Sequence, residues 1–140
     1  MRITTELYSF VKQNALGEVA GVRTGFQISH HPDTVRVCNI GFIRAQRVPT
    51  SVVKGFFQGP PDLAVEVLSP EDRAGKVMAK VQDWLRAGCR AVWVVDPDCQ
   101  TVTIYDDQQR TATLTTSDEL VGGDLVPGFR LPVGEIFKSS

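Results

Sequence analysis

One carboxylate stands inside an otherwise apolar segment of this sequence. Residues 63–68 read LAVEVL, so Glu66 is the single charged side chain in a run of strand length. A buried carboxylate costs several kcal/mol unless it is neutralised, hydrogen-bonded or bound to a cation. The sequence therefore predicts a compensating group close to Glu66.

The candidates for that group lie on the helix that the next residues predict. Arg73, Lys76 and Lys80 form one stripe beside its apolar face, and Lys80 is best placed to meet Glu66, while Lys76 stays open as the alternative. A strand carboxylate beside a lysine, with a further acid from a neighbouring strand, suits Mg²⁺-assisted hydrolysis of phosphodiesters. The competing interpretation is a buried ion pair that only fixes the helix against the sheet.

These groups must be positioned by a unit in which a strand, a helix and a second strand follow one another. Apolar residues at helical spacing predict a helix over residues 72–87, and Gly88 is its expected end. The apolar run at 91–95 predicts a second buried strand, parallel to the strand at 63–68. This βαβ unit is the expected centre of the fold.

The remaining elements are expected around that unit. The patterns predict a helix at residues 4–16, an antiparallel pair of strands at 19–28 and 35–43, and a loop at 55–61. A half-buried or edge strand is expected at 101–105 and a weaker one near 112–114. The tail is expected to pack across the sheet as a loop and a final helical turn. The fold class is therefore α/β, with a mixed sheet.

Composition limits the possible classes of protein. The 140 residues predict a single domain, and no apolar run approaches the roughly 18 residues of a membrane-spanning helix, so the cytoplasm is expected. Three cysteines without a CxxC pair favour reduced structural thiols over a zinc site or disulfides. A net charge of −1 argues against tight DNA binding by a monomer, so any DNA contact must be local.

The second half of the chain contains PDLAVEVLSP at residues 61–70, Lys80, Trp84, the pair Ala87-Gly88 and VWVVDP at residues 92–97. This order of motifs resembles the Uma2 family, also called DUF820. The resemblance extends from about Gly17 to the segment PGFRLP at residues 127–132. It implies a PD-(D/E)XK restriction-endonuclease-like fold, Mg²⁺ as cofactor and DNA as substrate.

The resemblance assigns roles to three positions. Glu66 matches the family's metal-binding glutamate and Lys80 matches the lysine that the family keeps on the next helix, whereas Leu68 stands where older nuclease patterns have lysine. Asn39 stands where the second metal-binding acid, an aspartate, is expected. An amide is a neutral and weaker ligand for Mg²⁺, so an impaired site is expected. The chain is also expected to be N-terminally short for the family.

Other polar and aromatic residues favour structural interpretations. Asp62 and Asp96 are interpreted as turn residues, and His30 and His31 as a solvated loop without a third metal ligand. The two tryptophans, Trp84 and Trp93, are expected in the core.

Two other functions remain open beside the nuclease. One is a catalytically inactive binding or dimerisation module, and the other is a small-molecule hydrolase on the same scaffold. A homodimer is expected, joined by an exposed strand edge at residues 19–28 or its neighbour, with the helix carrying Leu7 and Phe10 as an additional contact.

Overall fold

The sheet at the centre of the protein carries the Glu66 segment on one of its middle strands. A computed structural model describes residues 1–29, 32–49 and 56–138. Within these ranges, a six-stranded sheet has the order β1-β4-β6-β7-β8-β9. Its strands are β1 (Gly17–Ala20), β4 (Ile40–Arg44), β6 (Leu63–Val67), β7 (Ala91–Asp96), β8 (Thr101–Asp106) and β9 (Thr111–Leu114).

The expected βαβ unit is confirmed. β6 and β7 pair in parallel, with Leu63 opposite Ala91, and α2 (Ala74–Ala87) connects them. The helix ends at Gly88, whose φ of 109° lies in the left-handed region that residues with a Cβ rarely adopt. All the other sheet pairings in this layer are antiparallel, so the sheet is mixed as expected.

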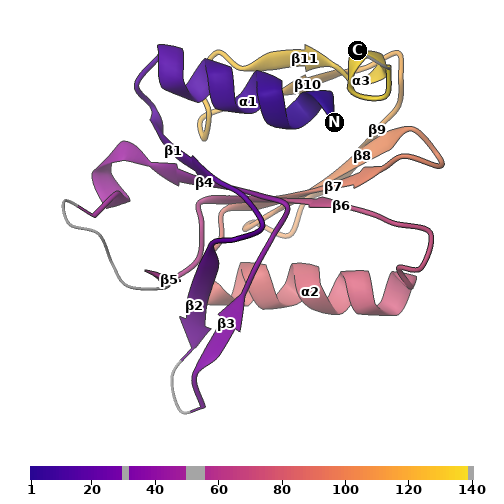
Figure 1. The fold of residues 1–140 in the computed structure, drawn as a ribbon. Coiled ribbons are helices and arrows are strands. Elements are labelled where there is room, and N and C mark those ends of the chain that lie inside the picture. The colour runs from indigo at the N-terminus through magenta and orange to yellow at the C-terminus, as the bar shows by residue number, and fades with distance from the viewer. Residues whose placement is uncertain (30–31, 50–55, 139–140) are drawn as a thin grey trace.

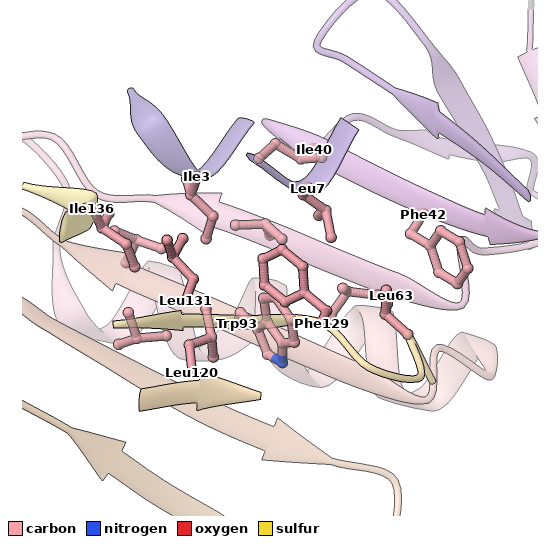
Figure 2. Close-up of a cluster of buried hydrophobic side chains, with 14 of the residues drawn as sticks. Ile3, Leu7, Ile40, Phe42, Leu63, Trp93, Leu120, Phe129, Leu131 and Ile136 are labelled. Carbon is pink, nitrogen blue, oxygen red and sulfur yellow. The ribbon is translucent and has the colours of Figure 1, made fainter. Parts of the chain in front are cut away.

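The sheet is covered on both faces (Figure 1). One face carries α1 (Arg2–Gln13) and the C-terminal β10 (Glu119–Val121), β11 (Arg130–Pro132) and α3 (Val133–Ile136), and the other face carries α2. Under α1 lies the larger core cluster, in which Leu7, Trp93 and Phe129 are almost wholly buried (Figure 2). The apolar stripe of α1 is thus used inside its own chain. This finding argues against the additional dimer contact expected through Leu7.

The N-terminal strand pair differs from the expectation. Residues 19–28 do not form one strand, because a turn that Thr24 closes by donating to the carbonyl of Gly21 separates β1 from β2 (Gly25–Ser29). The partner segment breaks in the same way, into β3 (Thr34–Arg36) and β4. The antiparallel ribbon therefore joins two sheets: β1 pairs with β4 in the main sheet, and β2 pairs with β3 in a small one. His30 and His31 lie outside the described residues.

Two further short segments were expected as loops. β5 (Phe56–Gln58) lies within the loop expected at 55–61 and pairs in parallel with β2, and Gly55 lies outside the described residues. In the tail, β10 and β11 form an antiparallel pair before the final helical turn, α3. A short 3-10 helix, η1 (Ala45–Arg47), follows β4. Among the described residues, no helix combines the length and apolar character needed to cross a membrane.

Candidate active site around Glu66

Strand alternation directs Glu66 toward α2. Leu63 and Val65 belong to the core cluster under α1, whereas Ala64 belongs to the second cluster, which Val81 and Trp84 of α2 cover. Glu66 shares the parity of Ala64, so its side chain leaves the sheet on the α2 face. Because β6 is central, Glu66 is buried, with 5% of its surface exposed.

Lys80 is the cation that reaches this carboxylate. Its Nζ lies 2.7 Å from Oε2 of Glu66, and its side chain is 39% exposed while that of Glu66 is 7% exposed. The expected pairing of Glu66 with Lys80 is confirmed. In the described part of the chain Lys76 forms no ion pair with Glu66, a point that the sequence left open. One end of the ion pair is therefore fixed inside the protein, while the other remains in contact with solvent.

The strand register brings Asn39 to the same place. β4 and β6 are antiparallel with Ile40 opposite Val65, so Asn39, one residue before Ile40, lies beside Glu66, one residue after Val65. Oδ1 of Asn39 accepts a hydrogen bond from the backbone N–H of Val67 at 2.8 Å. The amide oxygen that would have to serve as a metal ligand is thus already tied to the neighbouring strand, although an oxygen acceptor has two lone pairs.

The electrostatics of Glu66 combine opposing effects. Burial is the largest and raises the pKa of this carboxyl above its ordinary value, while Lys80 and the backbone of Asn39 lower it and the charge of Asp72 raises it. The net shift is upward. Oε1 of Glu66 is buried without a hydrogen-bond partner in the described part of the chain. Such an oxygen is costly in a folded protein and is satisfied best by a cation or a donor from outside the chain.

A small pocket of about 90 Å³ lies over these groups. It is lined by Asn39, Glu66, Val67, Leu68, Asp72, Lys76, Val77 and Lys80. The structure thus brings together all three residues that the sequence predicted for the site, and it adds Lys76 and Asp72. Arg73, the third residue of the predicted basic stripe, is the exposed N-cap of α2 and does not line the pocket.

Asp72 is the residue that sequence reasoning missed. It precedes α2 in a Ser-Pro-Glu-Asp segment typical of a helix start, and no spacing rule connects it with Glu66. The available signal was its position in the loop that follows the carboxyl end of the buried parallel strand β6, where α/β folds gather functional groups.

The oxygen ligands that the pocket offers supply part of the coordination of Mg²⁺. Mg²⁺ is usually held by one or two carboxylates together with waters and substrate phosphates. The pocket offers the carboxylates of Glu66 and Asp72 and the amide of Asn39. Within residues 1–29, 32–49 and 56–138, no three or more His, Cys, Asp or Glu side chains gather closely enough to enclose a metal by themselves. A cation here would depend on water and substrate for the rest of its coordination.

Asp62 holds a second buried carboxylate, at the opposite end of β6. It is 3% exposed, lies 3.1 Å from Nη1 of Arg47 and accepts a hydrogen bond from the backbone N–H of Arg44 at 2.9 Å. The interpretation of Asp62 as a turn residue is therefore incomplete, because its side chain anchors the segment after β4. Asp96 does serve a turn, since its Oδ1 accepts from the backbone N–H groups of Asp98 and Cys99.

Comparisons with known proteins agree with this architecture. A family model described as "Uma2: Putative restriction endonuclease" matches residues 1–134. Among solved structures, a crystal structure from Anabaena variabilis ATCC 29413, described as a putative nuclease belonging to DUF820, superposes with a TM-score of 0.82 at 24% identity, covering 97% of this chain and 76% of that chain. No curated protein matches the sequence. With 134 of its 140 residues matched and its fold reproduced, the chain belongs to the Uma2 family.

Proposed function

We propose that this chain is a Uma2-type nuclease whose site at Glu66, Lys80 and Asn39 acts on DNA phosphodiesters with Mg²⁺, at a rate that Asn39 reduces. Membership of the Uma2 family, whose description reads "Putative restriction endonuclease", supports the reaction class. The single observation that carries the proposal is the Glu66 carboxylate, which is buried, has one oxygen without a partner and lies 2.7 Å from Lys80 at a small pocket.

The residues divide the work by their chemistry. A bound Mg²⁺ supplies Lewis-acid activation of the phosphodiester, and Glu66 and Asn39 are the proposed ligands. Lys80 has three N–H donors and is partly exposed, so one donor can stay on Glu66 while another meets a phosphate oxygen. Its charge offsets the negative charge that the phosphoryl oxygens carry as water attacks phosphorus. The pocket also touches the first turns of α2, where the helix dipole favours an anion.

Asn39→Asp tests this proposal directly. Aspartate keeps an oxygen acceptor for the N–H of Val67 and adds one negative charge beside Glu66. We expect calorimetry to show weak Mn²⁺ and Mg²⁺ binding by the wild type and at least about tenfold tighter binding by Asn39→Asp, because affinity follows the charge of the ligands. Cleavage of supercoiled plasmid DNA should rise in parallel and should be lost in Asn39→Asp/Lys80→Met.

The matched control is Asn14→Asp, which makes the same exchange at an exposed residue just after α1, far from the pocket in sequence. It should change neither metal affinity nor cleavage. If Asn39→Asp binds both ions no more tightly than the wild type, Asn39 does not limit the site. If no variant cleaves DNA under conditions in which metal binds, the nuclease proposal is wrong.

The absent second strand carboxylate also favours a different function, a catalytically inactive binding or dimerisation module on the same fold. It predicts no cleavage by the wild type or by Asn39→Asp.

We further propose that residues 1–140 act as one domain, in the cytoplasm, and as a homodimer. β1 supports the last proposal because it is the edge strand of the main sheet, as expected for the N-terminal strand pair.

A further inference from the structure

Asp72 is held in a fixed orientation at the rim of the pocket. Its Oδ2 accepts hydrogen bonds from the backbone N–H of Ser69 at 2.7 Å and from the Ser69 hydroxyl at 3.2 Å. The backbone N–H of Asp72 donates in turn to the carbonyl of Ser69 at 3.0 Å. The carboxylate is therefore oriented before any ligand arrives, which lowers the entropy cost of binding one.

Only one of the two oxygens of Asp72 takes part in that turn. In the described part of the chain Oδ1 accepts no hydrogen bond, and Asp72 forms no ion pair, although Lys76 and Lys80 line the same pocket. A carboxylate beside two lysines that pairs with neither has an oxygen available for another cation.

The buried oxygen of Glu66 is the second, independent observation. Glu66 is 5% exposed, and its Oε1 has no partner, whereas Asn39 contributes no charge and its Oδ1 is bonded to the backbone of Val67. Asp72 is close enough for its charge to act on Glu66. The pocket thus contains one unsatisfied buried carboxylate oxygen and one oriented carboxylate with an unused oxygen.

We propose that Asp72, together with Glu66, binds the divalent cation at this pocket and supplies the carboxylate that Asn39 lacks. This inference rests on the proposed function, since it concerns the same metal. The formal charges support this assignment. The two carboxylates of Glu66 and Asp72 cancel the two ammonium groups of Lys76 and Lys80, so the pocket has no net charge that would repel a divalent cation or the phosphodiester that the cation binds. The second acid then comes from the loop before α2 instead of from the region of β4.

Binding of Mn²⁺ without DNA tests the inference independently of activity. The free ion is followed by its electron paramagnetic resonance signal in titrations of the wild type, Asp72→Asn and Glu71→Gln. Asp72→Asn keeps an oxygen acceptor for Ser69, so thermal unfolding should stay close to that of the wild type. We expect it to weaken Mn²⁺ binding by about tenfold or more.

Glu71→Gln is the matched control, because it removes one negative charge from the adjacent, exposed residue, which does not line the pocket. It should bind Mn²⁺ as the wild type does. Asn39→Asp/Asp72→Asn should recover binding, since a carboxylate returns beside Glu66 on the other side of the pocket. Should Asp72→Asn fail to fold, Asp72→Ser, which keeps a hydroxyl acceptor at the turn, replaces it.

The inference is overturned if Asp72→Asn binds Mn²⁺ like the wild type, if Glu71→Gln weakens binding equally, or if the wild type binds no Mn²⁺. These outcomes differ from failure of the nuclease proposal. A wild type that binds Mn²⁺ through Asp72 but never cleaves DNA would support the role of Asp72 and refute the reaction.

Discussion

Replacing Lys80 with methionine should make the stability of this protein depend strongly on pH. Methionine keeps the apolar stem of the side chain and removes the ammonium that lies 2.7 Å from Glu66. Without its nearest cation, the buried carboxyl of Glu66 must either stay charged or take up a proton, and the pH determines which of the two occurs.

The magnitude follows from the unequal exposure of the two partners. Exposed ion pairs contribute about 0.2–1 kcal/mol, and breaking a buried pair costs about 3–5 kcal/mol. Here the carboxylate is 7% exposed and the lysine is 39% exposed, so solvent screens one end of the pair. We expect Lys80→Met to lose about 2 kcal/mol of unfolding free energy at pH 8, between those two ranges.

The sign of the pH dependence follows from the direction of the pKa shift. Burial raises the pKa of Glu66 in the folded state above the ordinary value of 4.5. At pH values between 4.5 and that raised pKa, the folded protein therefore binds more protons than the unfolded chain. Stability from this group is therefore greatest at low pH and falls as pH rises through that interval. Removing Lys80 raises the folded pKa further, so the loss caused by Lys80→Met should be small at pH 4 and should grow to its full size at pH 8.

Urea denaturation in EDTA between pH 4 and pH 8 measures this effect. Lys76→Met is the matched control, because Lys76 lines the same pocket without pairing with Glu66, and its effect should be small and independent of pH. Glu66→Gln should abolish the extra pH dependence of Lys80→Met when the two are combined. A Lys80→Met loss that is equal at pH 4 and pH 8, or that Lys76→Met reproduces, would refute the reasoning.

Other parts of the structure yield three further expectations. Asp62→Asn should cost about 2 kcal/mol in urea denaturation, because it removes the buried charge that Arg47 and the backbone of Arg44 bind. Among the three thiols only Cys99 is exposed, so a thiol reagent should label it in the native protein and reach the two buried thiols only after unfolding. If the edge of β1 joins two copies, light scattering should report a mass near twice 15.4 kDa, and a monomer that persists on concentration would exclude the homodimer.

The centre of the fold was predictable because its signals are local. β6, α2 and β7 each bury a continuous apolar run or stripe, and Gly88 marks the end of the helix by its own backbone conformation. Glu66 was found because a charge within such a run contradicts the pattern. Lys80 was found because the periodicity of the helix places it on the stripe that can bend back toward the strand, and the structure distinguishes it from Lys76 on the same stripe.

The missed features depend on contacts between segments far apart in the sequence. β5 is three residues long and becomes a strand only by pairing with β2, and the tail hairpin of β10 and β11 is equally short. The break between β1 and β2 arises because the two strands pair in different sheets, although Gly21 and Gly25 are typical of a bend inside a strand. Asp62 resembles a turn residue in the sequence, because only the fold brings Arg44 at the end of β4 and Arg47 of η1 close to its carboxylate.

In α2, the charged residues that line the pocket are different from the buried residues that pack in the core. Because β6 and β7 are parallel, the connecting helix runs back along the sheet, and its first turns lie over the carboxyl end of β6, where Lys76, Lys80 and Glu66 meet. The buried Val81, the residue after Lys80, and Trp84, about one turn beyond Lys80, belong to the second core cluster. That packing can hold the helix in place whether or not the Glu66 carboxylate is satisfied. The cost of an unpartnered buried oxygen is therefore confined to the end of the strand where an external cation or hydrogen-bond donor can offset it.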